Sequence, residues 1–418
     1  MTEALPKSDP LPTGAGGPAR PNLPALGLAL LLVFALVWLR VADLRRSERA
    51  SIHWVAEHVA EDDENGRDGV QGHETKLTRS KNQGMALQRA AFGQRDLLPL
   101  YGSSELNKPI PDKASAFFQS YPTGFDVFPI GRAGTTSLIM LQKLAGVGRE
   151  ARGRKVAFLL SPGWFFIESI EGRFYEGNFS KHQASALIFG SEFSFALKQG
   201  AARRMLSHPL TLERTPLLRF AIERLAHGRA VDRWLYNLAA PLGWMQNVVF
   251  AIQDDYESTQ SLSKESSGRL ETAPHVAKAL DWKDLLAKAS EDTAPPDEHP
   301  FKANAAADAA FRETMGNSTE WTDFELLLEG VNELGVEPLI ICIPPNGWYI
   351  EANGVSHETL ELFEQRIHEM CHRDGVPVVA FEDHLEDRKF IIDHWDHLSV
   401  KGWMFVNQAL DEFYHRGD

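Results

Sequence analysis

An uncharged apolar run near the N-terminus constrains this chain more than any other feature. Leu23 to Leu39 reads LPALGLALLLVFALVWL, and the side chain of Arg40 can reach a membrane surface, so that the span continues to residue 42. A helix needs about 20 such residues to cross a bilayer. No small-residue cleavage pattern follows the run. We therefore predict an uncleaved signal anchor over 23–42, preceded by a disordered cytoplasmic tail over 1–22 that is rich in Pro and Gly.

The charges that flank this span bear on its orientation. Lys7 and Arg20 are the basic residues before it, whereas four arginines follow it, at positions 40, 45, 46 and 49. By the positive-inside rule alone, the large C-terminal part of the chain would stay in the cytoplasm.

Short apolar runs alternate with helical patterns beyond a predicted juxtamembrane helix and linker at 43–94. Runs that are apolar on both faces are typical of parallel strands covered by helices on each side. The predicted strands are residues 97–101, 125–130, 155–160, 337–343 and 376–381. This order predicts a three-layer α/β/α fold with a central parallel sheet over 95–418.

The pattern changes within an insertion at about 180–318. Residues 180–250 have helical patterns rich in aromatic residues, and residues 254–300 are polar. We predict a helical insertion followed by a poorly ordered segment. Aromatic stripes on such helices are more often core than binding surface.

Charge and cysteine content exclude several classes of function. The net charge is −14 at pH 7, so no basic stripe offsets the repulsion of phosphates, and we predict no nucleic-acid partner. Cys342 and Cys371 alone can form neither a disulfide framework nor a zinc site. We predict no metal and no cofactor.

Polar and glycine-rich stretches follow the predicted strands, where open parallel sheets form their sites. A serine hydroxyl needs a base that takes its proton and a third group that orients the base. Asp393 and His397 can supply these roles for a serine at the end of the first strand, and the backbone at 131 and 134 can place N–H donors at an oxyanion. The stretches are YGSSEL, GRAGTTSL, SPGWF, PPNGWY and FIIDHWDHLSVKGW.

Each stretch also has a structural explanation. Ser103 and Ser104 before an acid can cap a helix, Ser399 can start the last helix, and the glycines can serve tight turns. The order of the stretches favours catalysis: a serine after the first strand, a glycine loop after the second, and an acid with a histidine near the C-terminus. Since successive side chains that leave a strand point to opposite sides, we expect Ser104 to face His397 and Ser103 to face backbone.

These stretches and the N-terminal anchor together resemble the DltD family, a membrane-anchored branch of the SGNH/GDSL-like hydrolases; the fourth match extends to PPNGWYIEANGVS. The resemblance implies an exported SGNH-like catalytic domain, periplasmic or on the outer surface. It implies a role in D-alanylation of teichoic acid or another envelope polymer, beside a membrane-bound O-acyltransferase and a D-alanyl carrier protein. It also implies that Ser104 is the nucleophile, that Ser104 and Gly134 form the oxyanion hole, and that His397 is the base.

Two positions depart from the pattern of the superfamily. Its members usually place the acid three residues before the histidine, where this chain has His394 between Asp393 and Asp396. A carboxylate four residues back can reach the imidazole within one turn, whereas adjacent side chains usually diverge, so we choose Asp393 over Asp396. Gly163 stands where the superfamily has an asparagine, so one oxyanion donor is missing or comes from backbone.

Three functions remain open at this point. The first is a serine acyltransferase or esterase that handles D-alanyl esters through a covalent Ser104 intermediate. The second is a non-catalytic scaffold that holds the acyltransferase and the carrier together, against which the intact serine, acid and histidine argue. The third is an O-acetyl esterase of an extracellular polysaccharide. Nothing in the sequence separates D-alanyl from acetyl groups.

Overall fold

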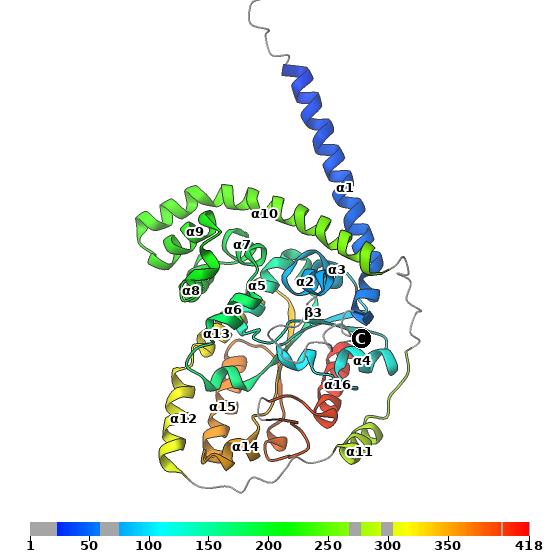
Figure 1. The fold of residues 1–418 in the computed structure, drawn as a ribbon, viewed down its shortest axis with the longest axis vertical. Coiled ribbons are helices and arrows are strands. Elements are labelled where there is room, and N and C mark those ends of the chain that lie inside the picture. Colours follow the sequence, from blue (N-terminus) through cyan, green and yellow to red (C-terminus); the bar gives the residue numbers. More distant parts are fainter. Residues whose placement is uncertain (1–22, 59–74, 267–276, 294–303, 394–395, 418) are drawn as a thin grey trace, which may run out of the picture. The chain divides into compact units, whose positions relative to one another are not determined.

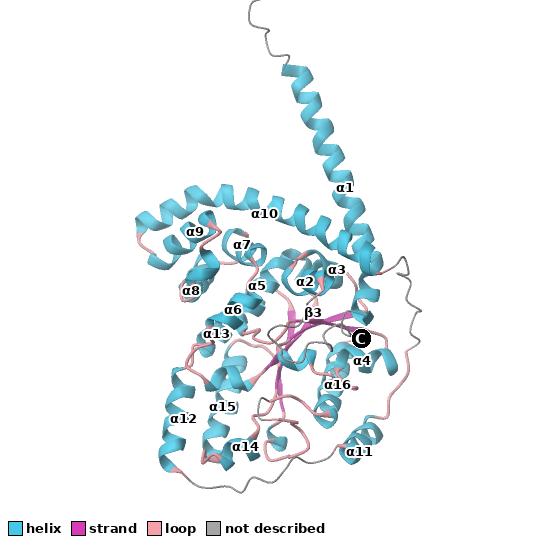
Figure 2. Cartoon of the chain, viewed as in Figure 1, coloured by secondary structure: helices cyan, strands magenta, loops and turns pink. Residues whose placement is uncertain are grey.

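The computed structural model describes residues 23–58, 75–266, 277–293, 304–393 and 396–417. Within them, five parallel strands form one sheet in the order β2-β1-β3-β4-β5. Figure 2 shows the strands in magenta, surrounded by helices in cyan. The predicted parallel sheet is confirmed, and each strand lies inside its predicted range. The strands are β1 (Leu97–Tyr101), β2 (Asp126–Ile130), β3 (Lys155–Leu160), β4 (Glu337–Cys342) and β5 (Val378–Ala380).

Helices cover both faces of this sheet, which confirms the predicted three-layer architecture. Alternate strand residues face opposite layers: Tyr101 and Phe158 stack on one face, with ring centroids 5.2 Å apart, whereas Leu100 and Leu159 belong to the core of the other. The first face packs against α3 (Ala86–Phe92), α5 (Ser137–Val147), α13 (Glu320–Leu334) and α15 (His357–Arg373). The second packs against α4 (Ala114–Ser120), α11 (Trp282–Asp292) and α16 (Val400–His415).

Local sequence explains where several of these helices begin and end. The Ser356 side chain accepts a hydrogen bond from a backbone N–H in the first turn of α15, and Ser399 does the same for α16. Gly335 ends α13 in the left-handed conformation, with φ of +70°. Ser399 therefore has the structural role that its position before the last helix suggests.

The order of the strands brings the functional loops together. β2 and β3 lie on opposite sides of β1, so the chain leaves this part of the sheet in two directions. Tyr101 pairs with Ile130 in β2 and with Phe158 in β3, so β1 and β2 end level with each other. In open α/β sheets such a switch point is where ligands bind.

Most of the residues between β3 and β4 are helical. The longest helix of this insertion is α10 (Ala230–Glu265), which Figure 1 shows arching over α7, α9 and the short helices α2 and α3. Besides α11 and α13, the described α-helices between β3 and β4 include α6 (Gly172–Asn178), α7 (Lys181–Phe189), α8 (Phe195–Met205), α9 (Pro216–His227) and α12 (Ala305–Asn317). Beyond the insertion, α2 (Lys76–Gln83) precedes α3, and α14 (Gly347–Ala352) follows β4.

The polar segment that we predicted from residue 254 is in part helical. α10 continues to Glu265, because Asp254 and Asp255 are buried and accept hydrogen bonds from the backbone at 85 and 86 and from Arg45. Residues 282–292 form α11. Residues 267–276 and 294–303 lie outside the described part of the chain.

The predicted anchor lies in α1 (Leu23–His58). Among the described helices, α1 alone is long and apolar enough to cross a bilayer, in agreement with the predicted single-pass anchor. Its large apolar side chains between 26 and 39 are exposed, as lipid contact requires. The chain divides after Asp43, and from Leu44 onward α1 belongs to the same compact unit as the sheet, into whose core it buries Ile52 and Val55. Residues 1–22 and 59–74 lie outside the described residues.

Candidate active site

The turn that follows β1 depends on two glycines in close backbone contact. The Gly102 N–H donates to the carbonyl of Ile130 at 3.2 Å, and a Cβ on Gly131 would lie 1.9 Å from the Gly102 carbonyl oxygen. A Cβ on Gly102 would lie 2.7 Å from a carboxylate oxygen of Glu105. The chain can therefore turn sharply at the end of β1, and the 3-10 helix η2 (Ser104–Asn107) begins directly after this turn.

A chain of hydrogen bonds links Ser104, His397 and Asp393. The Ser104 Oγ lies 2.9 Å from Nε2 of His397. Nδ1 of the same ring lies 2.7 Å and 2.9 Å from the two carboxylate oxygens of Asp393. A carboxylate at Nδ1 fixes the proton on that nitrogen, which leaves Nε2 as an acceptor for the serine O–H. The three residues whose proximity the sequence suggested are thus in contact.

The two neighbouring serines have different partners, as strand geometry predicts. Ser103 is fully buried, and its Oγ accepts a hydrogen bond from the Gly134 N–H at 3.2 Å. Within the described part of the chain, no side-chain hydrogen bond from Ser103 caps η2. The hydroxyl of Ser104 instead points to His397. The capping explanation for this pair therefore does not apply to Ser103.

The backbone donors expected at the oxyanion are engaged in this structure. The Gly134 N–H donates to Ser103, and the Gly131 N–H donates to Oδ1 of Asn82 at 3.2 Å. Gly134 has φ of +85°, and a Cβ there would lie 2.6 Å from Cβ of Phe174. A glycine is thus required at 134 for conformation and for packing. Its N–H can meet an oxyanion after it leaves the Ser103 oxygen.

The alternative acid, Asp396, does not bind the His397 imidazole; its side chain binds the backbone of two other loops. Its carboxylate accepts hydrogen bonds from the backbone N–H of Asn346, at 3.3 Å, and of Gly163. Asp396 is buried and has φ of +64°, a conformation that favours glycine. Burial raises its pKa to about 7, and the charge of Asp393 adds to that effect, although the two backbone hydrogen bonds oppose it. Asp396 therefore ties the His397 loop to the ends of β3 and β4.

Asn346 is a positioning residue that sequence reasoning missed. Its side-chain amide donates to the Asp393 carbonyl at 2.6 Å, while its backbone N–H donates to Asp396. It is 1% exposed, in the turn that follows β4. The signal was present in the PPNGWY stretch, where a single amide side chain comes after two prolines at the end of an apolar strand.

A second buried acid supports the serine turn and was also missed. Glu105 accepts the Ser103 N–H at 2.5 Å and is 1% exposed. Burial raises its pKa to about 7, against the hydrogen bonds from the backbone N–H groups of Ser103 and of Glu105 itself. The acid that follows the two serines thus holds their backbone from inside the fold.

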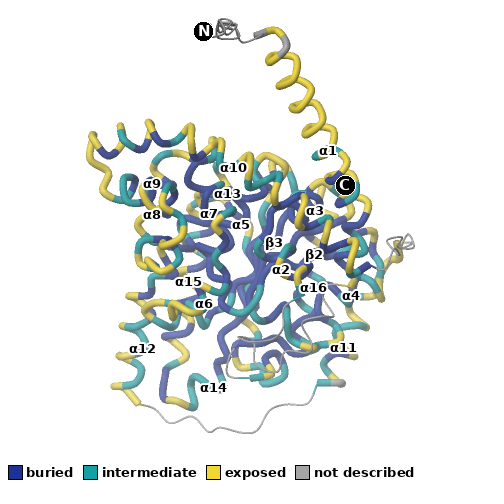
Figure 3. Tube along the Cα trace, turned by 45° about the horizontal axis from the view of Figure 1, so that its top comes forward, coloured by how far each residue is buried: buried dark blue, intermediate teal, exposed yellow. Residues whose placement is uncertain are grey.

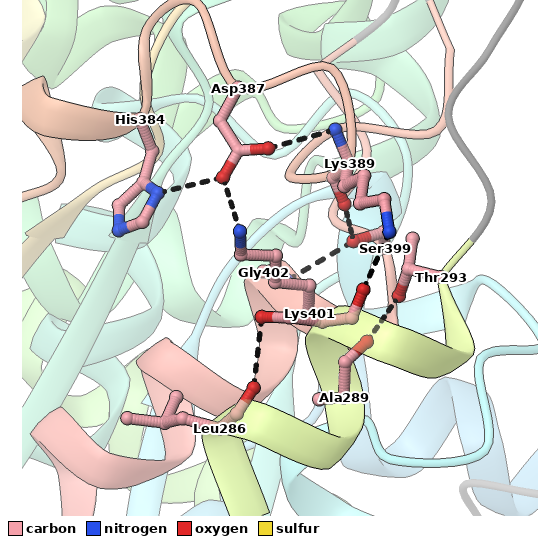
Figure 4. A network of polar contacts seen from close by, with 10 residues as sticks. Leu286, Ala289, Thr293, His384, Asp387, Lys389, Ser399, Lys401 and Gly402 are labelled. Carbon is pink, nitrogen blue, oxygen red and sulfur yellow. Dashed lines mark hydrogen bonds and ion pairs between the residues drawn. The ribbon is translucent and has the colours of Figure 1, made fainter. Parts of the chain in front are cut away.

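Figure 4 shows how the loop that carries His397 is fixed to the start of α16. The Asp387 carboxylate contacts Nζ of Lys401 at 2.6 Å, Nδ1 of His384 at 3.0 Å and the backbone N–H of Lys389 at 3.0 Å. Burial raises the pKa of Asp387, but the hydrogen bonds from Lys401, His384 and Lys389 outweigh it and lower the pKa overall. The Lys389 carbonyl accepts from Ser399 at 2.5 Å. Both ends of the loop are therefore held by charged or capping contacts.

One cluster of potential metal ligands lies apart from these residues. Among the described residues, Glu351, His357 and Glu386 have ligand atoms within 4.8 Å of one another. Nδ1 of His357 lies 3.1 Å from Glu351 and 3.6 Å from Glu386, so the imidazole already contacts both carboxylates. We assign no metal to this cluster, because it is largely exposed.

Comparison with known proteins gives matches that cover most of the chain. Residues 74–415 match a family model described as DltD protein. The chain is 27% identical over 356 residues to Protein DltD of Bacillus subtilis (strain 168), a match that covers 82% of this chain and 88% of the relative. It is 24% identical over 356 residues to Protein DltD of Staphylococcus aureus, with 82% and 87% covered. It is 22% identical over 408 residues to Protein DltD of Lacticaseibacillus rhamnosus, with 94% and 90% covered.

Proposed function

This chain belongs to the DltD family, and from that premise we propose that it is a membrane-anchored serine acyltransferase or esterase in the D-alanylation of cell-envelope polymers. The observation that carries the proposal is the contact of Ser104 with His397, whose second nitrogen contacts Asp393. The polymer is teichoic acid or another envelope glycan. The catalytic domain lies outside the cytoplasm and works with a membrane-bound O-acyltransferase and a D-alanyl carrier protein.

The first half of the reaction transfers the acyl group to the protein. His397 Nε2 takes the Ser104 proton while Oγ bonds to the carbonyl carbon of a D-alanyl ester or thioester. Asp393 stabilises the imidazolium that forms. The bond to the leaving group then breaks, His397 gives the proton to that group, and an acyl ester remains on Ser104.

The second half of the reaction releases the acyl group. A hydroxyl of the polymer, or water, loses its proton to His397 and bonds to the acyl carbon. The ester bond to Ser104 breaks, and the proton returns to Oγ. In both halves the backbone N–H groups of Ser104 and Gly134 stabilise the oxyanion, which requires the Gly134 N–H to leave the Ser103 oxygen.

Substitution of the nucleophile in cells tests this proposal. We would compare the alkali-labile D-alanine ester content of envelopes from cells that carry wild-type protein, Ser104→Ala or Ser103→Ala at equal protein level. We expect loss of the esters with Ser104→Ala and near-normal content with Ser103→Ala. Normal content with Ser104→Ala would point to a scaffold or to acetyl chemistry.

A further inference from the structure

Helix α10 exposes a series of large apolar side chains, while several of its buried positions are polar or small. Its buried positions include Asp232, Gly243, Asp254, Asp255 and Ser258. Exposed and buried positions alternate along the helix in Figure 3. What we call the outward stripe is the set of exposed large apolar side chains of this helix: Val231, Trp234, Leu238, Leu242, Trp244, Met245, Val248, Val249 and Tyr256.

Specific contacts fix the helix in this rotation. Asp254 accepts hydrogen bonds from the backbone N–H groups at 85 and 86, both at 2.6 Å. Asp255 pairs with Nε of Arg45 at 3.0 Å. A Cβ on Gly243 would lie 2.2 Å from the ring of Phe189, so only a glycine allows this approach. Turning the stripe inward would break these contacts, so the outward stripe is a property of the folded domain.

The stripe has the chemistry of a helix that lies at a membrane surface. Residues 234–253 contain no Asp, Glu, Lys or Arg. Trp234 is 63% exposed and Trp244 is 59% exposed, and tryptophan is enriched where lipid meets water. Among the described helices α1 alone is long and apolar enough to cross a bilayer, so α10 is not apolar enough to be a second span. Large apolar side chains exposed together on one helix indicate an interaction surface.

The stripe also lies close, along the chain, to the membrane anchor. Arg45, which pairs with Asp255 near the end of α10, follows Leu39 by six residues of one continuous helix. Six helical residues span about 9 Å. Arg45, Arg46 and Arg49 are exposed there, where their charges can meet lipid headgroups. The end of α10 is thus tied to a residue that follows the apolar span by only six positions along the chain.

We propose that the outward stripe of α10 lies in the interfacial layer of the lipid bilayer, with its apolar side chains among the headgroups and the first acyl carbons. Amphipathic helices in this position lie in the plane of the membrane, about 5–10 Å deep. A second membrane contact besides the anchor would limit rotation of the domain relative to the bilayer and would fix the distance of Ser104 from the membrane surface. We name lipid as the occupant because the charge-free run carries exposed tryptophans and its helix is tied to the residues that follow the membrane anchor.

Fluorescent labels on the stripe test this contact in the full chain. Leu238→Cys and Leu242→Cys, labelled separately with an environment-sensitive nitrobenzoxadiazole group, would be reconstituted without other proteins into vesicles of phosphatidylethanolamine and phosphatidylglycerol. Leu362→Cys on α15, 37% exposed, is the matched control, and the native Cys342 and Cys371 are buried. We expect blue-shifted emission at 238 and 242, and quenching by lipids spin-labelled near the headgroup that is several-fold stronger than at 362.

Equal access of aqueous iodide to labels at 238, 242 and 362 would overturn the proposal. So would protection that appears only after a membrane-bound O-acyltransferase is added, because the stripe would then be covered by protein. Trp234→Phe/Trp244→Phe provides a second measurement without cysteines: brominated lipids should quench the wild-type protein more than this variant. None of these readouts depends on the triad, so they can fail or succeed independently of the proposed function.

Discussion

The hydroxyl oxygen of Ser104 lies 2.9 Å from Nε2 of His397, although 293 positions separate the two residues. The contact exists because η2 leaves the end of β1 while the loop before α16 returns over the ends of β3 and β4, where Asp396 binds it. The two hydroxyls of the serine pair and the two acids near His397 consequently occupy different environments, which variants can distinguish.

The two serines should differ in reactivity toward a fluorophosphonate probe. We expect the probe to label wild-type protein and Ser103→Ala, and to spare Ser104→Ala, because His397 contacts the Ser104 hydroxyl alone of the two. Gel fluorescence at equal protein amounts measures the labelling. Labelling that survives in Ser104→Ala and disappears in Ser103→Ala would move the nucleophile by one residue.

Replacement of the two acids should have unequal effects on turnover. Asp393→Asn removes the carboxylate that holds the proton on Nδ1 of His397, and such a loss can cost on the order of 10⁴-fold in kcat. Asp396→Asn keeps an oxygen that can accept from Asn346, so its cost should be much smaller. Hydrolysis of an activated ester provides the rates. A greater loss for Asp396→Asn would identify that residue as the triad acid.

The pH dependence of stability should reveal the buried Asp396 carboxyl. Its ordinary pKa is 3.8, and burial raises the folded-state pKa to about 7. Between about pH 4 and pH 7 the folded state therefore holds a proton that the unfolded state has lost, so this group's contribution to stability falls as pH rises through that window. Asn at 396 does not titrate. We expect the free energy of unfolding of wild type to fall relative to Asp396→Asn across this window, and a constant difference would refute the assignment.

Gly131 and Gly153 both have positive φ, but we expect a side chain to destabilise the fold far more at Gly131, where the backbone is crowded, than at Gly153, which is open. Gly153 has φ of +63°, and nothing lies within 4 Å of the position that a Cβ would take there, so Gly153→Ala should cost about 1–2 kcal/mol from backbone strain. Gly131→Ala would also drive its Cβ into the Gly102 carbonyl, which should add roughly 1–3 kcal/mol. Denaturant unfolding compares the two variants, and equal losses would show that the turn can relax.

The orientation of the domain is testable in intact cells. We expect residues 43–418 to lie outside the cytoplasm, in accord with the proposed role and against the bias of the arginines after the span. Protease added to spheroplasts should then digest the domain without lysis. Protection that is lost only after lysis would reverse the orientation.

Most of the fold and part of the candidate site could be predicted from local sequence patterns. The strands could be located because parallel strands that are buried on both faces need runs of apolar residues, and the anchor because a bilayer demands length without charge. The serine, glycine and histidine loops could be placed at one edge because parallel strands end on the same side. The roles of Asn346 and Glu105 could not be predicted, since no sequence periodicity distinguishes a buried amide or acid from an exposed one.

The sequence by itself determined which residues share a face of an element or follow a strand. Only the tertiary structure decided which groups contact each face and which acceptor each N–H donor binds. The Gly134 N–H could be placed near the serines, but only the packed loops pair it with Ser103. Asp393 and Asp396 are equivalent in a linear reading until the loop conformation turns one toward His397 and the other toward Asn346. The apolar stripe of α10 looked like core, and it faces outward because buried charges on the opposite side of the helix find their partners in the domain. Contacts between segments that are distant in the sequence decide such cases, and the periodicity of neighbouring residues carries no information about those contacts.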